Sequence, residues 1–531
     1  MNSIIMHWRA VFEEEENKYN KSSFVFIIFF LMGSIIYFSK IVTDLPNPDA
    51  VWNGMFFKDN CGWEISLGRY VIGILQVFRT YIINSTFITL VCMLLLSFIC
   101  IYVVKIFDIR TLGWKFLVGA LIIISPTVGS TLTYYYCSDF YLISYLLAVL
   151  AVWLMLREGK TCLFVASICL MVSAAIYQAY ISLAILLCFI YLMKMLVDPE
   201  VNDKQIIEKT IRFLIGGFVG VVLYLISNRA VQRICMIDAP QDRGFAQMGV
   251  INFKNIFGQI AQCYRNFWQY YFGSSMINNL CYFRKEGNAL FFFLLGVLLF
   301  SILLGQKVRS IRKLVFMVMS LLYPLISMNI CILAPKVSIF DPTGVLMLPT
   351  MNYLYIFAVI LIRHLNVKEF WCTVYGVGVF VGTAAVFVML LWLELGGQTY
   401  MKYNMLKTYN VSRKIEEKMD LFGKNAEKLC IVGNMESGNY PEIYPELAES
   451  QHWVTAGYKL IWQDFNGCQT CWCEFMKQYL GKTYDMCSKD QYDEIITTPE
   501  YTAMGIFPEE NGAVLINDIV VIKLSNPVEG W

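Results

Sequence analysis

The chain has 531 residues, of which 57% are hydrophobic and only 15% are charged. Soluble domains carry about 25% charged residues, so this composition excludes an ordinary water-soluble fold and predicts a membrane protein. Lys and Arg number 42 and Asp and Glu 40, a net charge of +2 that excludes a global basic field for nucleic acid. The chain has only three histidines (His7, His364 and His452), which disfavours a histidine metal site or a Ser-His-Asp triad.

Uncharged apolar runs recur along the first three quarters of the chain. A hydrocarbon core about 30 Å thick needs about 20 mainly apolar residues per helical span. Runs that approach this length lie at 23–39, 85–104, 116–131, 140–155, 161–175, 181–193, 213–227, 289–305, 314–334, 343–362 and 370–393. They predict an α-helical polytopic membrane protein with about 11 transmembrane helices, and the soluble composition beyond them predicts a small C-terminal α/β domain.

The distribution of Lys and Arg predicts the orientation of these spans. With a cytoplasmic N-terminus, the inside segments carry 18 Lys and Arg in 72 residues, whereas the longer outside loops carry 12. Short cytoplasmic loops are enriched in basic residues. We therefore expect a cytoplasmic tail at 1–22, a membrane domain at 23–395 and an extracytoplasmic domain at 396–531. The acidic run Glu13–Glu16 precedes the first span and argues against a cleaved signal peptide.

Two expected outside loops, 40–84 and 228–288, are too long to be simple connections. Both are rich in aromatic residues, and the segments 68–83 and 252–272 each predict a helix that lies in the membrane interface with basic residues on its polar side. Aromatic belts with snorkelling basic side chains are the alternative reading.

The C-terminal domain shows its own helix and strand patterns. Residues 409–429 predict an amphipathic helix, and 429–434 predict a buried strand. Residues 511–525 predict two short strands that turn at Asn517 and Asp518.

Cysteines are concentrated in the expected outside segments, which hold ten of the 17. An extracytoplasmic location permits disulfides. The cluster CQTCWC at 468–473 also has the spacing of half a zinc site, but a second such half is missing from the sequence. Disulfides or free thiols are therefore favoured over a metal.

The apolar runs contain no Asp, Glu, Lys or Arg, and the nearest carboxylates, Asp139 and Glu394, lie at their ends. Proton- and ion-coupled transporters usually carry ionisable residues at membrane depth. The charge distribution therefore favours chemistry at the outer membrane interface over a pathway through the membrane.

The first outside loop gathers Asp44, Asp49, Asp59 and Glu64 shortly before Arg69. Transfer of a sugar from a lipid phosphate needs an ionised carboxylate to accept the proton of the acceptor hydroxyl, and a cation to stabilise the departing phosphate. The loop supplies both, although solvated acidic residues are also common in outside loops. Its carboxylates are also ligands that magnesium and manganese accept, so a divalent cation stays open as a cofactor.

Three motifs follow Asp49 in order: GWEISLGRY from Gly62, SPTVGSTLTYYYCSD from Ser125 and AIYQAY from Ala175. Their order, with the terminal IFPEENGAVLINDIVVIKLS, resembles the bacterial Gtr-type glucosyltransferases, which are multispan GT-C enzymes associated with serotype-converting modification of O-antigen. The resemblance covers most of the membrane part. It implies a GT-C-like fold and transfer of a sugar, usually glucose, from a polyprenyl-phosphate donor to a cell-surface polysaccharide at the outer face of the bacterial cell membrane.

The same resemblance suggests roles for particular residues. Asp49 is the first candidate for the catalytic base and Asp44 the second, because the family's adjacent acidic pair appears here as PNPDAV. Gly68 and Arg69 match the family's Gly-Arg motif, and Arg69 is expected to bind the donor phosphate with Arg243 and Arg265. The residues expected to bind substrate are Glu64, Asp139, Tyr177 and Gln178. Asp139 could equally cap the following helix.

The expected partners are the lipid-linked donor, the surface polysaccharide acceptor and membrane lipid, with no nucleic acid. The resemblance also implies a functional link to a donor-making synthase and to a flippase. A polysaccharide flippase or transporter without transferase activity is the competing class of protein.

Overall fold

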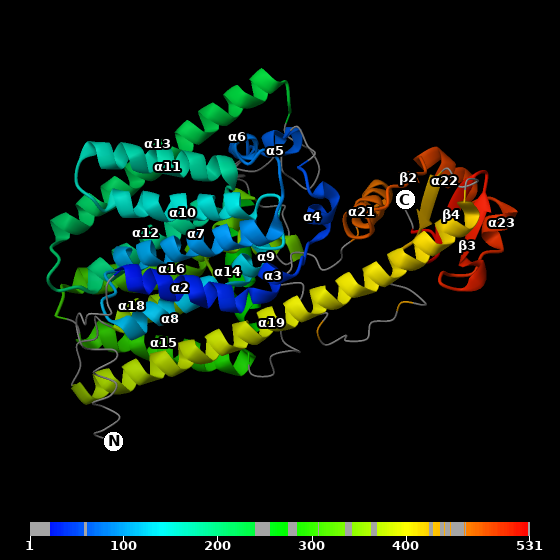
Figure 1. Cartoon of the computed structure of the whole chain (residues 1–531). Coiled ribbons are helices and arrows are strands. Elements are labelled where there is room, and N and C mark those ends of the chain that lie inside the picture. The colour runs from blue at the N-terminus through cyan, green and yellow to red at the C-terminus, as the bar shows by residue number, and fades with distance from the viewer. Residues whose placement is uncertain are drawn as a thin grey trace.

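A computed structural model shows a mostly helical molecule with a small sheet near the C-terminus (Figure 1). The described residues are 22–57, 61–238, 255–273, 284–305, 307–334, 342–362, 369–423, 428–435, 440, 447, 461 and 464–528. Most of the expected cytoplasmic tail lies outside these ranges, as do Asp59 and Arg243.

Every predicted apolar run coincides with a helix. The helices are α2 Ser22–Ile36, α7 Ser85–Ile106, α8 Leu112–Ile123, α10 Ser138–Met155, α11 Lys160–Ile176, α12 Ala179–Val197, α13 Asp203–Cys235, α15 Arg284–Gly305, α16 Ser310–Ser327, α18 Tyr353–Ile362 and α19 Glu369–Phe422. Within the described residues, seven helices are long and apolar enough to cross a membrane, and four of these eleven are shorter apolar helices. The molecule is therefore a polytopic helical membrane protein, and the count of 11 spans stays a prediction.

Four of the predicted runs are interrupted in the structure. The run 23–39 divides between α2 and α3 Phe38–Val42, and the run 314–334 divides between α16 and the short helix α17 Ile330–Leu333. The run 116–131 divides into α8 and the short helix α9 Pro126–Thr131, because Pro126 has no amide hydrogen with which to continue α8. The run 343–362 divides into the 3-10 helix η5 Pro342–Met347 and α18. These short segments pack together, and the Thr127 hydroxyl donates a hydrogen bond of 2.8 Å to the Val345 carbonyl. A side chain thereby satisfies a backbone oxygen where helical bonding is broken.

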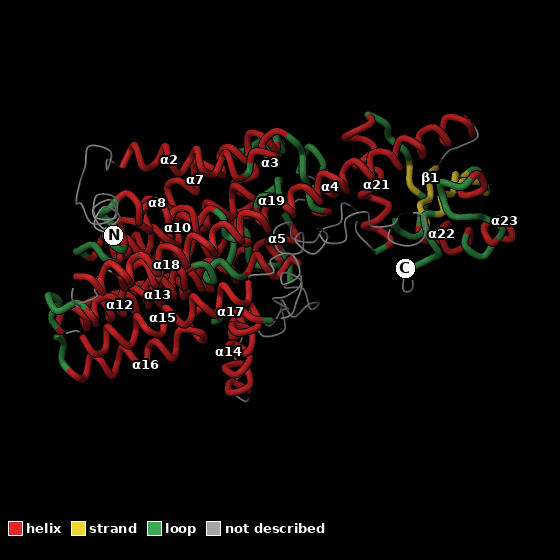
Figure 2. Tube along the Cα trace, turned by 90° about the horizontal axis from the view of Figure 1, so that it is seen from below, coloured by secondary structure: helices red, strands yellow, loops and turns green. Residues whose placement is uncertain are grey.

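The two long loops contain the expected helices with different limits. In the first loop lie α3 Phe38–Val42, α4 Pro48–Asn53, α5 Gly62–Ser66 and α6 Val71–Phe78. In the second, α13 continues to Cys235, so this loop begins later than predicted, and α14 Ile256–Phe272 follows. Figure 2 shows α14 running across the direction of the long helices, as a helix in the membrane interface would.

Helix α19 runs without a break from the apolar region into the C-terminal region (Figure 1). The predicted domain boundary at 395/396 therefore lies inside a continuous helix rather than in a linker. Glu394 is fully buried in this helix, and its carboxylate lies 2.9 Å from the Nζ atom of Lys40 on α3. Lys40 also donates to the Gly129 carbonyl at 2.7 Å, so this ion pair joins α3, α9 and α19.

The C-terminal α/β unit, residues 409–528, has three layers. Its sheet has the order β2-β1-β4-β3, with β1 Lys428–Val432 parallel to β2 Asp485–Met486 and to β4 Ile519–Lys523, and β3 Ala513–Ile516 antiparallel to β4. The sheet's two faces are covered by α19 with α21 Phe465–Leu480, and by α22 Lys489–Ile495 with α23 Pro499–Thr502. Asn517 and Asp518 form the β3–β4 turn with positive φ angles, which confirms the predicted strands and turn.

Candidate functional site

The loop that carries Asp44 and Asp49 is held against the segment between α9 and α10. The Leu45 amide donates to the Tyr135 hydroxyl at 2.7 Å, and the Asn47 amide donates to the Thr133 carbonyl at 3.2 Å. The Asn47 side chain caps α4 by accepting from the Ala50 amide, and Pro48 occupies its first turn. Asp49 therefore projects from a capped, anchored helix rather than from a free loop.

The two candidate bases have different surroundings. Both are half-buried, and Asp44 accepts a hydrogen bond from the Ser85 hydroxyl at the start of α7. Asp49 lies close to Tyr134: burial raises the pKa of this phenol and the negative charge of Asp49 raises it further, whereas the Arg69 guanidinium lowers it. Asp49 and Arg69 thus both act electrostatically on one tyrosine.

Arg69 is half-buried among tyrosines. Its Nη1 atom donates to the Tyr141 hydroxyl at 3.1 Å, and its guanidinium lies 4.8 Å from the centre of the Tyr177 ring. These two rings stack on each other with 4.4 Å between their centres. The Nε atom of Arg69 is buried without a hydrogen-bond partner, and among the described residues its guanidinium has no carboxylate within salt-bridge distance. Donors are therefore left for an anionic ligand.

Gln178 and Gly68 fix the backbone next to Arg69. The Gln178 amide donates to the Leu67 carbonyl at 2.6 Å and to the Tyr224 hydroxyl at 2.9 Å. Gly68 has φ +78°, and a Cβ atom added there would lie 2.5 Å from the Tyr224 hydroxyl oxygen. The Gly-Arg and Tyr-Gln motifs, which are more than 100 residues apart, therefore meet, and Gln178 positions the backbone that carries Arg69.

A Gly68→Ala substitution is expected to lower the free energy of unfolding by about 2 kcal/mol or more, because it adds a steric contact to an unfavourable positive φ. Gly481→Ala is the matched control: Gly481 has φ +66° and ψ 20°, in the left-handed region, but open space around its Cβ position, so only the backbone cost of about 1 kcal/mol applies. Thermal unfolding of the detergent-solubilised protein measures both. Adding Tyr224→Phe to Gly68→Ala should recover part of the loss, and equal stability of the two Ala variants would contradict the steric argument.

Asp139 pairs with Arg79, a basic residue of the predicted interfacial segment 68–83. Arg79 Nη1 lies 2.9 Å from the Asp139 carboxylate, and Arg79 also donates to the Tyr136 carbonyl. Asp139 lies in the first turn of α10, but the N-cap position is Cys137, which makes no side-chain capping bond. Arg79 is thus neutralised while Arg69 is not, which favours Arg69 over Arg79 as a phosphate ligand.

Of the other predicted site residues, Glu64 lies near this group: burial raises the pKa of Tyr136, and the Asp49 and Glu64 carboxylates raise it further. Glu64 is buried on α5, and its backbone carbonyl accepts from the Arg69 amide at 2.7 Å. Arg265 is exposed on α14, which packs mainly on α15, α16 and α17. Arg243 lies outside the described residues. Within the described residues, groups of three or more His, Cys, Asp or Glu side chains that could hold a metal ion are absent.

The C-terminal α/β unit makes a contact beside the candidate site that the sequence did not predict. Helix α21 packs on α4, the helix that carries Asp49. Gln478 donates to the Val51 carbonyl at 3.2 Å, and the Cys471 thiol contacts the Pro48 carbonyl at 3.7 Å. Cys471 is buried in this contact, where it packs with Val51 and Phe475.

The tyrosines around Arg69 were also missed as individual site residues. Tyr134 and Tyr141 are buried and Tyr136 is partly buried, and they form ring contacts with one another or with Tyr177. Tyr177 itself has its pKa raised to about 12 by burial, against the lowering effect of Arg69. The sequence signal was the run YYYCSDFY, since several tyrosines next to an apolar span are unusual unless their hydroxyls find partners.

Fold and site together define a helical membrane protein whose loops gather carboxylates, the half-buried Arg69 and a tyrosine cluster at one end of the helices. The family model described as glucosyl transferase GtrII matches residues 55–362, more than half of the chain, and the chain belongs to this family. Membership implies a glucosyltransferase that acts on a cell-surface polysaccharide. The matched range contains Arg69, Asp139 and Gln178 but begins after Asp49. No curated protein and no solved structure matches the chain.

Proposed function

We propose that this protein is a GT-C-like enzyme that transfers glucose from a polyprenyl-phosphate donor to a hydroxyl of a surface polysaccharide. The reaction takes place at the outer face of the bacterial cell membrane, with the N-terminus inside and the C-terminal α/β unit outside. The observation that carries the proposal is the half-buried Arg69 guanidinium, whose buried Nε donor has no partner and which shares the tyrosine cluster with Asp49. A buried donor without a partner is costly, and an anionic ligand would satisfy it.

The proposed reaction is a single displacement at the anomeric carbon. The Asp49 carboxylate accepts the proton of the acceptor hydroxyl while the hydroxyl oxygen forms a bond to the anomeric carbon. The bond from that carbon to the phosphate oxygen breaks, and polyprenyl phosphate leaves with the electron pair. Arg69 donates hydrogen bonds to the phosphate oxygens and stabilises the charge that develops there. The proton ends on Asp49 and the configuration at the anomeric carbon inverts.

The surroundings of the site suggest where the other partners approach. Tyrosine faces such as those of Tyr141 and Tyr177 can pack against a sugar ring, and α21 covers α4 from the side of the C-terminal α/β unit. We assign the acceptor polysaccharide to that side and the lipid tail of the donor to the membrane. A synthase must make the lipid-linked donor, and a flippase must deliver it to the outer face.

Reconstitution in vesicles tests the proposal. Purified protein is mixed with polyprenyl-phosphate [14C]glucose and an O-antigen acceptor, and incorporation of label into polysaccharide is measured. Arg69→Ala should lower incorporation by about a hundredfold or more, because it removes donors to the leaving phosphate. Arg309→Ala is the control, since Arg309 is an exposed residue paired with Asp203 elsewhere in the molecule.

Three outcomes would contradict parts of the proposal. Movement of the labelled lipid across the vesicle membrane without transfer to acceptor would favour the flippase class. Full activity of Arg69→Ala would remove Arg69 from the site. Equal loss in Arg309→Ala would show that the effect is one of general surface charge.

A further inference from the structure

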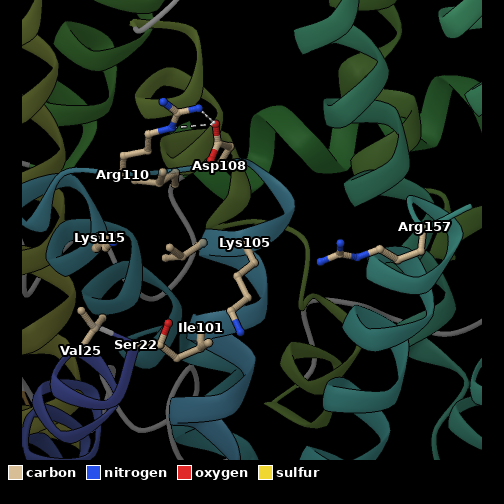
Figure 3. A pocket seen from close by; sticks show the side chains of 10 residues that line it. Ser22, Val25, Ile101, Lys105, Asp108, Arg110, Lys115 and Arg157 are labelled. Carbon is tan, nitrogen blue, oxygen red and sulfur yellow. Dashed lines mark hydrogen bonds and ion pairs between the residues drawn. The ribbon is translucent and has the colours of Figure 1, made fainter. Parts of the chain in front are cut away.

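A basic pocket lies at the other end of the helices that carry the candidate site (Figure 3). Its volume is about 350 Å³, and it is formed by the start of α2, the end of α7, the start of α8 and the end of α10. The charged residues that line it are Lys105, Asp108, Arg110, Lys115 and Arg157. Four bases and one acid give the lining a net charge of +3 at neutral pH.

Two of the cations are held in place by a pair of aromatic rings. The Lys105 ammonium lies 5.3 Å from the centre of the Tyr102 ring, and the Arg157 guanidinium lies 4.6 Å from the centre of the Trp153 ring. The two rings contact each other edge to face with 5.2 Å between their centres. The contact brings Lys105 and Arg157, from two different helices, to the same pocket, and Figure 3 shows Arg157 extending toward Lys105.

The acid in the pocket is already engaged. Asp108 accepts from Arg110 at 3.0 and 2.9 Å, so it neutralises that arginine, whereas Lys105 and Arg157 add positive charge to the same pocket. Val25, Ile101 and Val104 supply apolar wall beside these charges. Apolar walls reduce the local dielectric constant and strengthen the attraction of the bases for an anion.

The pocket and the candidate site lie at opposite membrane faces. Helix α7 starts at Ser85, which donates to Asp44, and its last turn carries Lys105 of the pocket. A helix of 22 residues is about 33 Å long, which matches the hydrocarbon thickness of a bilayer. The basic segments of the chain assign the pocket's face to the cytoplasmic leaflet, where anionic lipids are exposed to short basic loops.

We propose that this pocket binds the phosphodiester headgroup of an anionic phospholipid of the inner leaflet. Lys105 and Arg157 contact the phosphate oxygens, Lys115 contributes charge from α8, and the acyl chains remain in the bilayer beside α2 and α7. A bound lipid would join the ends of four helices at the face opposite to catalysis. The proposal is independent of the glycosyltransferase reaction.

Lipid binding by the full-length protein in detergent tests this site. Native mass spectrometry or thermal stabilisation is measured against phosphatidylglycerol, with phosphatidylcholine as the zwitterionic reference and inorganic phosphate as the soluble source of the same group. The wild type should prefer phosphatidylglycerol. The double variant Lys105→Gln/Arg157→Gln should bind it at least tenfold more weakly, and Lys105→Arg/Arg157→Lys should restore binding.

The matched control removes the same charge elsewhere on this face. Lys204 and Lys307 are exposed and do not line the pocket, so Lys204→Gln/Lys307→Gln should bind phosphatidylglycerol as the wild type does. The proposal is overturned if the pocket variant keeps wild-type affinity, if both double variants weaken equally, or if inorganic phosphate stabilises the protein as well as phosphatidylglycerol does. Binding of phosphatidylglycerol by Lys105→Arg/Arg157→Lys would show that the weaker binding of the glutamine variant does not reflect misfolding.

Discussion

An Asp49→Asn variant is expected to transfer glucose about a thousandfold more slowly than the wild type, because an amide cannot accept the acceptor proton. The substitution keeps the shape of the side chain, and α4 retains its cap through Asn47 and its contact with α21. The variant should therefore insert and unfold like the wild type. Initial rates of label transfer at saturating donor, with thermal unfolding as the folding control, measure the effect.

Asp44→Asn is the matched comparison because it makes the same chemical change five residues away in the same loop. Asp44 already accepts from Ser85, and an asparagine oxygen can keep that bond, so we expect less than a tenfold loss of rate. A large loss of transfer rate in Asp44→Asn with a small loss in Asp49→Asn would instead assign the base to Asp44. Near wild-type rates in both variants would show that neither carboxylate is the base.

Breaking the buried ion pair between Lys40 and Glu394 should have the largest effect on stability. Lys40→Met alone or Glu394→Met alone leaves one charge in a fully buried site, at a cost of about 3–5 kcal/mol. The double variant Lys40→Met/Glu394→Met leaves no uncompensated charge and should recover most of that loss. Urea or thermal unfolding in detergent, as far as it is reversible, measures the difference.

The control for this prediction is an exposed pair. Arg309 lies 2.6 Å from Asp203 with 77% of its side chain exposed, so Arg309→Gln should cost less than about 1 kcal/mol. If the double methionine variant is as unstable as the single variants, packing of the long side chains rather than charge compensation explains the loss. If the single variants are as stable as the wild type, the ion pair has no stabilising role.

The regular part of the fold could be predicted from the sequence because it depends on local composition. Apolar runs gave a helix every time, and alternation with a polar turn gave strands β3 and β4. The breaks before α9 and α18 were not predicted. An apolar run shows how long a helix could be, but it does not show where a distant side chain replaces a broken helical hydrogen bond. Pro126 was a visible signal, whereas the Thr127 bond to Val345 depends on a contact 218 residues away in sequence.

The site was predictable only in part, for a similar reason. The motifs drew attention to Gly68 and Gln178, and the structure brings these two positions together beside Arg69. The partner of Asp139 was missed, because Arg79 comes from another element and spacing cannot show which of two nearby arginines is neutralised. Glu394 was placed at the end of a span and Lys40 at the start of an outside loop, whereas the structure buries them as one internal ion pair.

Because α19 is continuous, it fixes how the C-terminal α/β unit is rotated about the helix axis relative to the membrane part. At 1.5 Å per residue its 54 residues extend about 80 Å, from the membrane part through Glu394 to Val411, Ile415 and Met419 beneath the sheet. A single residue added between Glu394 and Val411 would turn the sheet by about 100° around the helix axis and move α21 away from α4. The number of residues in this stretch, more than their identity, therefore decides whether the C-terminal α/β unit faces Asp49. An insertion of whole helical turns would keep this rotation, but it would still move the C-terminal α/β unit away from Asp49 along the helix axis.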